Sequence, residues 1–236
     1  MRLDSYLVDN GYFDSRNKAN EAIKGGKIEI NGEVILKPSF ILKKNDIINV
    51  DEKGNYVSRA SYKLLSLLKY FPIDFVGKRV LDVGASTGGF TQIALERCAK
   101  EVICVDVGKS QLHHKIKENP KVKSFESCDI RDFIDDIGFD ILLCDVSFIS
   151  VLYIAEAISA LSNGCIVILF KPQFEVGRDS KRDKNGVVSD TKDIENAKQK
   201  VVDRFKQLGW NNIYEQSSEI RGKEGNTEIF LCFAHQ

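Results

Sequence analysis

The sequence predicts an α/β protein in which a mostly parallel sheet with helices on both faces follows a small α+β module. Two observations predict this fold. From residue 79 onward, apolar runs without polar alternation recur between helical segments, as in strands buried on both faces. Before residue 50 the elements are shorter, and the charged segment VDEKGNYVSR separates the two regions. We therefore predict a module at residues 1–50, a linker at 51–57 and the larger domain at 58–236.

Composition limits the classes of protein that remain open. The formal net charge is zero, so a nucleic-acid partner has to be argued from local patches. The start MRLDSYLVDNG is charged and lacks the apolar core of a signal peptide, and no apolar stretch is long enough to span a membrane. The six cysteines fall mostly in apolar runs without Cys-x-x-Cys pairs or neighbouring histidines. We expect a soluble cytoplasmic protein with buried thiols, no membrane association and no metal.

The module is predicted to contain two helices and a hairpin. RLDSYLVDNG has Leu3 and Leu7 on one helical face and ends at a glycine. DSRNKANEAIKGG is a second helix, with Asp14 or Ser15 as its N-cap. KIEINGEVIL follows as a hairpin with an Asn-Gly turn, and DIINV closes the module as a strand.

This order of elements resembles the αL RNA-binding domain found in a ribosomal protein, pseudouridine synthases and other RNA-modifying enzymes. The match covers about the first fifty residues. The resemblance implies that cations of the two helices contact RNA phosphates, although ordinary solvated charges are the alternative. The implied contacts are Arg2, Arg16, Lys18, Lys24, Lys27 and Lys37.

Polar residues follow the predicted strands of the larger domain. Parallel strands end at one edge of their sheet, and ligands of such sheets bind beyond that edge. The strands RVLDVG, EVICVDVG, VKSFESCD, FDILLCDVS and CIVILF alternate with helices, and a longer helix and two final strands complete the domain. The residues at these strand ends are Gly84, Asp106, Asp129, Asp145 and Lys171.

The segment VLDVGASTGGFTQ, residues 80–92, has the composition of a ligand-binding turn. Gly84 would end the strand tightly, Gly88 and Gly89 would let a ligand approach the backbone, and the helix from Phe90 would offer free N–H groups. The segment resembles the first motif of class I methyltransferases, which have a Rossmann-like fold and bind S-adenosylmethionine. The resemblance implies cofactor contacts at Asp82, Gly84, Ala85, Ser86, Gly88, Gly89, Phe90 and Thr91.

Two carboxylates extend this predicted cofactor site. Asp106 stands where both carboxylate oxygens could accept ribose hydroxyls, a use shared with nicotinamide-dependent enzymes. Asp129 would lie near the adenine amino group, or else cap a helix in IRDFID.

Four polar residues at element ends form a second pattern. Lys63, Asp145, Lys171 and Glu228 occur in the order of the Lys-Asp-Lys-Glu tetrad of ribose 2′-O-methyltransferases. With VSRASYKL, LDVGASTGGFT, CDVSFIS and KPQFEVG, they resemble the TlyA, or hemolysin A-like, family over essentially the whole chain. The resemblance implies cytidine 2′-O-methylation of ribosomal RNA within a ribosomal subunit or its precursor. S-adenosylmethionine would be the donor and S-adenosylhomocysteine the product, and Asp145 would also border the donor.

Lys171 is the candidate base of such a reaction. It follows the apolar run CIVILF, and Pro172 ends the strand directly after it. A lysine has an ordinary pKa near 10.4, so it can act as a base only where burial or another cation lowers that value. Lys63 could supply the second cation. The alternative is that Lys171 orients the hydroxyl without deprotonating it.

Further cations lie close in sequence to these residues. Arg59 and Arg131 are candidates for phosphate contact, as are Arg178 and Arg182 in EVGRDSKRDKNGVVSD, which is either a substrate lid or a solvated loop. Three other classes of protein are the alternatives. A non-catalytic RNA-binding protein would have no use for the tetrad, and a small-molecule methyltransferase would leave the αL-like module unexplained. A membrane-active cytolysin has no spanning segment in its support.

Overall fold

The computed structural model describes residues 1–50, 56–177 and 179–235, and they form two compact units divided between Asn55 and Tyr56. Two predictions therefore lie outside the described residues: most of the linker, at residues 51–55, and the RNA contact at Arg178. Within the described ranges, no helix has the length and apolar character needed to cross a membrane.

The first unit is a small α+β fold, as predicted. Its elements are α1 (Leu3–Asp9), α2 (Arg16–Lys24), β1 (Ile28–Ile30), β2 (Glu33–Val34) and β3 (Ile48–Val50), and its sheet has the order β2-β1-β3. Ser15 is the N-cap of α2 and accepts a hydrogen bond from Lys18 N at 3.4 Å. Asn31 and Gly32 have φ values of 54° and 84°, as the hairpin turn requires. Apolar residues of both helices and of β1 form its core.

The second unit is an α/β fold. Its elements in chain order are α3 (Arg59–Tyr70), β4 (Arg79–Val83), α4 (Gly89–Glu96), β5 (Glu101–Asp106), α5 (His114–Lys117), β6 (Val122–Glu126), β7 (Phe139–Cys144), η1 (Val151–Tyr153), α6 (Ala155–Leu161), β8 (Ser162–Phe170), α7 (Pro172–Glu175), α8 (Thr191–Gln207), β9 (Trp210–Ser217) and β10 (Ile229–His235). In the described part of the chain, seven strands form one sheet of order β6-β5-β4-β7-β8-β10-β9. The pairs from β6 to β8 are parallel, and β10 is antiparallel to both its neighbours.

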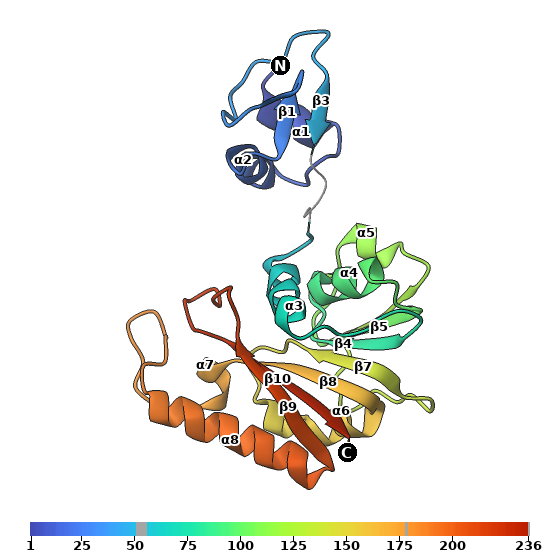
Figure 1. Ribbon diagram of the computed structural model, residues 1–236, viewed down its shortest axis with the longest axis vertical. Helices are drawn as coiled ribbons and strands as arrows, with labels where there is room; N and C mark the ends of the chain where they lie inside the picture. Colours follow the sequence, from blue (N-terminus) through green and yellow to red (C-terminus); the bar gives the residue numbers. More distant parts are fainter. Residues whose placement is uncertain (51–55, 178, 236) are drawn as a thin grey trace. The chain divides into compact units, whose positions relative to one another are not determined.

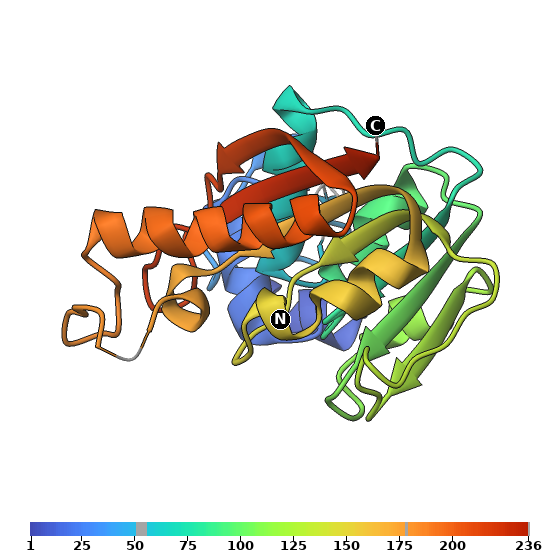
Figure 2. The ribbon, with the colours of Figure 1, turned by 90° about the horizontal axis from the view of Figure 1, so that it is seen from below.

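Helices cover both faces of this sheet, so the predicted fold class is confirmed (Figure 1). Side chains of α3, α4 and α5 pack on one face, and those of α6 and α8 pack on the other. The view in Figure 2 shows α8 and α6, coloured orange and yellow, along this second face. Two apolar cores therefore hold the central strands between them.

Two local predictions were wrong, and one alternative is excluded. β6 is an edge strand whose middle residues are exposed, because it has a partner on one side alone. Cys98 is exposed, since it lies in the turn after α4 and not in an apolar run, and Cys128 and Cys165 are half-buried. Asp129 caps no helix, because residues 130–135 form none; its Oδ1 accepts from Arg131 N at 2.9 Å instead.

Candidate active site

The polar residues predicted at strand ends lie along one edge of the sheet. Strands β4, β5, β7 and β8 are parallel, and they end at Val83, Asp106, Cys144 and Phe170. Gly84, Asp145 and Lys171 are therefore the first residues beyond three of them. Asp129 lies three residues beyond the end of β6, further along the same side. The parallel register brings groups that are far apart in the sequence to one edge.

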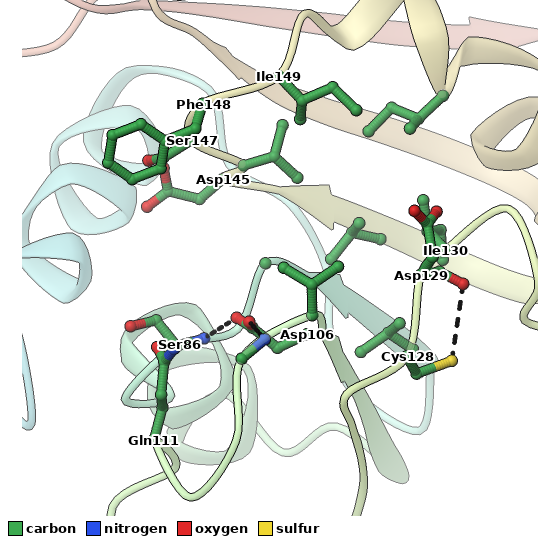
Figure 3. Close-up of a pocket in the computed structure, with 17 residues that line it drawn as sticks. Ser86, Asp106, Gln111, Cys128, Asp129, Ile130, Asp145, Ser147, Phe148 and Ile149 are labelled. Atoms are coloured by element: carbon green, nitrogen blue, oxygen red, sulfur yellow. Dashed lines mark hydrogen bonds between the residues drawn. The ribbon is translucent and has the colours of Figure 1, made fainter.

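A pocket of about 360 Å³ opens at this edge. Figure 3 shows Asp145, Ser147 and Phe148 along one wall, with Ser86 and Asp106 facing them. Cys128, Asp129 and Ile130 form its far end. We call this cavity the donor pocket. Its lining residues come from the ranges 83–86, 105–111, 128–130 and 145–154.

Asp106 is held in place by backbone groups of the donor pocket. Its Oδ2 accepts from Ser86 N at 2.7 Å, and its Oδ1 accepts from Gly108 N at 2.7 Å. Each carboxylate oxygen can accept more than one hydrogen bond, so both oxygens can still receive donors from a ligand. The two backbone N–H groups thus fix the carboxylate without using up its capacity.

The glycines of the turn after β4 serve different purposes. Gly84 has φ +78°, and a Cβ there would lie 2.9 Å from the carbonyl oxygen of Asp145, so the close approach of β4 and β7 requires glycine. A Cβ on Gly89 would lie 2.2 Å from Ser58 Oγ and 2.9 Å from Ala60 Cβ. Gly88 similarly faces Leu112. In the structure, the absence of a Cβ at Gly88 and Gly89 makes room for other parts of the protein, and the approach of a ligand to their backbone stays a prediction.

Asp82 lies beneath the turn and is 1% exposed. Its Oδ2 accepts from Thr91 N at 2.9 Å and from Thr91 Oγ1 at 2.6 Å, whereas its buried Oδ1 has no hydrogen-bond partner among the described residues. Burial raises the pKa of Asp82 from 3.8 to about 7, and the charges of Asp145 and Asp106 add to this effect. A buried, unpartnered carboxylate oxygen beside a cavity suits a ligand that carries a cation.

The raised pKa of Asp82 predicts a pH-dependent cost to folding. Below about pH 3 the carboxyl is protonated in both states and contributes nothing. As the pH rises to about 7, the unfolded chain ionises first, so the free energy of unfolding should fall by roughly 4 kcal/mol relative to Asp82→Asn. The asparagine variant keeps an acceptor for Thr91. Urea unfolding of both proteins at pH 4.5 and about pH 8 tests this, and an equal pH dependence of the two would refute it.

A second cavity, of about 250 Å³, adjoins the donor pocket. It is lined by Lys63, Asp82, Asp145, Ser147 and Lys171, among others, and we call it the lysine cavity. The two cavities share four lining residues, namely Gly84, Ser86, Asp145 and Ser147. A group bound in one can therefore reach a group bound in the other.

Two buried ion pairs stand in or beside the lysine cavity. Lys63 Nζ, from α3, lies 2.5 Å from Glu228 Oε2, directly before β10. Lys171 Nζ lies 2.6 Å from Asp145 Oδ1 and donates to Ser147 Oγ at 2.8 Å. Both lysines are 7% exposed. The four residues of the predicted tetrad thus come together as two lysine–carboxylate pairs, and each buried cation has its counter-charge.

Glu175 fastens the loop that carries Asp145 and Ser147. From α7 its carboxylate accepts from Ser150 Oγ at 2.6 Å and from Val151 N at 2.9 Å, and its burial raises its pKa. Phe148 in this loop has φ +67°, an unusual backbone conformation for a residue with a Cβ, and its side chain is exposed. The segments after β7 and β8 are therefore bound to each other at two points, through Lys171 and through Glu175.

The predicted RNA contacts of the first unit are partly engaged within it. Arg2 and Arg16 both pair with the buried Asp4, at 2.9 and 2.6 Å, and they lower the pKa of that carboxyl. Both arginine side chains are still about half exposed. Lys18 pairs with Asp14 at 3.1 Å, and exposed Lys24 and Lys37 and half-exposed Lys27 complete the set.

The predicted RNA contacts of the second unit have different surroundings. Arg59 is exposed at the first turn of α3 and lines the lysine cavity. Arg131 pairs with Asp129 at 2.6 Å, which lowers the pKa of Asp129 to about 2. Arg182 donates to carbonyl oxygens of its own loop, including Ser180 O at 3.2 Å. Of the three, Arg59 alone is at a cavity.

Sequence reasoning missed Ser147 and Glu175. Ser147 lies in CDVSFIS and Glu175 in KPQFEVG, two segments that carry the family resemblance. The spacing within these segments does not show which hydrogen-bond partner either residue has. It also missed helix α3, which a serine before an amphipathic run with Leu64, Leu67 and Leu68 could have indicated.

Comparison with known proteins gives a consistent result. Residues 56–235 match the FtsJ-like methyltransferase family, and residues 1–48 match the S4 domain. The chain is 39% identical to a 23S rRNA (cytidine-2′-O)-methyltransferase TlyA of Campylobacter jejuni, over 99% of each chain. It is 37% identical to a 16S/23S rRNA (cytidine-2′-O)-methyltransferase TlyA of Mycobacterium tuberculosis, over 100% of this chain and 90% of the other.

Solved structures show the same relationship. A protein named as a hemolysin from Streptococcus thermophilus superposes with a TM-score of 0.73 and 31% identity, covering 100% of this chain and 88% of that one. One from Lactococcus lactis has a TM-score of 0.72 and 35% identity, covering 77% and 89%.

Proposed function

Because the chain belongs to the TlyA family of FtsJ-like methyltransferases, we propose that it methylates the ribose 2′-hydroxyl of a cytidine in ribosomal RNA, with S-adenosylmethionine as donor. The observation that carries the proposal is the junction of the donor pocket with the lysine cavity at Asp145 and Ser147. Two buried lysines at this junction suit the activation of an alcohol, which is a weak nucleophile until its proton is removed.

The donor pocket fits S-adenosylmethionine in its chemistry. Asp106 offers two acceptors for the ribose hydroxyls, and Asp129, with Ile130, closes the end suited to the adenine. The free oxygen of Asp82, which lines the adjoining lysine cavity, suits the ammonium of the amino-acid end. When bound, the donor supplies an electrophilic methyl group on a sulfonium.

The tetrad residues are proposed to act on the ribose hydroxyl. Lys171 would take or orient its proton, and Asp145 holds the lysine in place. Lys63 adds a second cation beside the same cavity, fixed by Glu228. Positioning the hydroxyl against the methyl group can by itself contribute ~7–11 kcal/mol.

The first unit is proposed to bind ribosomal RNA. It matches the S4 domain, and its exposed cations can pair with phosphates. Lys24 and Lys37 are the best candidates for direct contacts, since no ion pair of theirs is found among the described residues.

This binding should depend on salt. Each phosphate contact releases counterions, so changing both Lys24 and Lys37 to glutamine should flatten the slope of log affinity against log salt by roughly 1 to 2. Fluorescence titration of a ribosomal RNA fragment between about 50 and 200 mM salt measures the slope. An unchanged slope would exclude both lysines from the interface.

The proposed reaction can be tested directly with labelled donor. Tritium from methyl-labelled S-adenosylmethionine should enter ribosomal RNA of intact subunits from a strain that lacks the enzyme. Nucleoside digestion should then recover the label in 2′-O-methylcytidine. Label in ribosomal protein or in a nucleobase would contradict the proposal, as would methylation of free nucleosides offered as the acceptor in place of ribosomal RNA. The 30S and 50S subunits, assayed separately, show which one is the substrate.

A further inference from the structure

The Lys171 amine is surrounded by acceptors. Nζ lies 2.6 Å from Asp145 Oδ1, 2.8 Å from Ser147 Oγ and 3.5 Å from the carbonyl oxygen of Asp145. Ser147 Oγ and the Asp145 carbonyl oxygen accept hydrogen bonds, and Asp145 Oδ1 forms an ion pair, so all three oxygens suit the protonated lysine. A neutral amine has a lone pair that needs a donor. Neither a carboxylate nor a carbonyl oxygen can supply one.

Ser147 differs from the other partners of Lys171 in two ways. Its hydroxyl both donates and accepts, so among the described groups in contact with Nζ it alone can serve the ammonium and the neutral amine in turn. It is also exposed and lines both cavities, whereas Lys171 is buried and lines the lysine cavity alone. The hydroxyl thus stands between the buried amine and the open side of the site.

The loop around Ser147 is fixed from α7. Glu175 holds Ser150 and Val151, and Lys171 itself holds Asp145 and Ser147. Ser150 is therefore already engaged by Glu175, which leaves Ser147 as the hydroxyl of this loop that faces the lysine.

We propose that Ser147 relays the proton of the ribose hydroxyl to Lys171, and so acts as a catalytic residue in contact with the reacting hydroxyl. This inference rests on the proposed function. The step begins after the Lys171 ammonium has released one proton to water. The neutral Nζ then accepts the Ser147 proton, while Ser147 Oγ takes the proton of the ribose hydroxyl. The ribose oxygen uses its freed electron pair to bond the methyl carbon, and the carbon–sulfur bond of the donor breaks with its electrons going to sulfur. The proton on Lys171 is afterwards returned to water.

Two variants of Ser147 and one control test the relay. Ser147→Ala removes the hydroxyl, and Ser147→Thr retains it. Ser162→Ala is the matched control, because Ser162 is a buried serine at the opposite end of β8, and its hydroxyl has no partner among the described residues. Single-turnover methyl transfer is measured with enzyme in excess, so that product release does not limit the rate.

The relay predicts a specific pattern of rates. Ser147→Ala should lower the single-turnover rate about 100-fold, and Ser147→Thr should recover it to within about tenfold of wild type. The rate is also measured in mixtures of light and heavy water and plotted against the deuterium fraction of the solvent. For wild type and Ser147→Thr this plot should be curved, since two protons move together. For Ser147→Ala it should be a straight line. A rate for Ser147→Ala within about threefold of wild type, or an unchanged curve, would overturn the relay.

The contact itself can be tested without donor or RNA. The Nζ nitrogen resonance of Lys171, observed by NMR of labelled apo protein, should move in Ser147→Ala and return in Ser147→Thr. No movement in Ser147→Ala would also overturn the relay. If wild type transfers no methyl group to ribosomal RNA, the proposed function fails; if wild type is active and Ser147→Ala behaves as wild type, the relay alone fails.

Discussion

Lys171→Ala is expected to abolish methyl transfer while the donor still binds. General acid–base catalysis contributes about 10²–10⁴-fold, and the rate should fall by at least that factor, because the variant loses both the amine and its hold on Asp145 and Ser147. Lys171 does not line the donor pocket, and the backbone groups that hold Asp106 there do not involve it, so calorimetric affinity for S-adenosylmethionine should stay within about threefold of wild type. Near-normal turnover would eliminate Lys171 from the reaction.

Lys198→Ala is the matched control for this loss. Lys198 is 9% exposed and pairs with Glu195 and Glu215 at 3.0 Å each, but it lies on α8 and lines neither cavity. Removing it therefore deletes a buried, paired lysine without touching the site. Equal loss of activity in both variants would point to damaged folding in place of a missing proton acceptor.

Lys171→Arg separates the base from the orienter. Arginine keeps a cation beside Asp145 but stays protonated at any pH the protein tolerates. If Lys171 removes the proton, the arginine variant should be as inactive as Lys171→Ala. If it only orients the hydroxyl, the variant should keep a measurable part of the activity.

Glu228→Ala is expected to be the most destabilising substitution at the site. It leaves Lys63 as a buried cation without its counter-charge, and breaking a buried pair in this way costs about 3–5 kcal/mol. The free energy of unfolding from urea melts should fall by that amount, and methyl transfer should be lost. The double variant Lys63→Met with Glu228→Leu should recover most of the stability without recovering activity.

An exposed pair provides the comparison. Lys69 and Glu219 lie 3.7 Å apart with side chains 62% and 49% exposed, so Glu219→Ala should change the stability by less than about 1 kcal/mol. If Glu228→Ala and Glu219→Ala were equally stable, Glu228 would not act as a stabilising counter-charge for buried Lys63.

The sequence predicted the sheet and its functional edge for a simple physical reason. Strands of a parallel sheet end on the same side, so naming the strands was enough to place Asp106, Asp145 and Lys171 together. The edge position of β6 could not be predicted in the same way. Which strands are central depends on the order in the sheet, and an apolar run does not show how many neighbours it will have.

The partners within the site were beyond sequence reasoning. Lys63 and Glu228 are 165 residues apart, and they meet because α3 packs beside the sheet where β10 begins. Lys63 and Glu228 are predicted as site residues by the resemblance to the Lys-Asp-Lys-Glu tetrad and not by their spacing in the sequence. Ser147 and Glu175 depend on hydrogen bonds of 2.6–2.9 Å, which only coordinates reveal. The role of Gly89 changed for the same reason, since its neighbour proved to be α3.

The place of β10 in the sheet has a consequence for how the protein is made. This strand follows the other strands of the sheet in the chain, yet it lies between β8 and β9 and is preceded by the carboxylate that neutralises Lys63. A nascent chain that stops before residue 228 therefore has an unpaired edge on β8 and a lysine with no counter-charge. The domain cannot assemble its four polar residues strand by strand during translation. Completing the sheet and assembling the four polar residues therefore depend on the same segment of the chain.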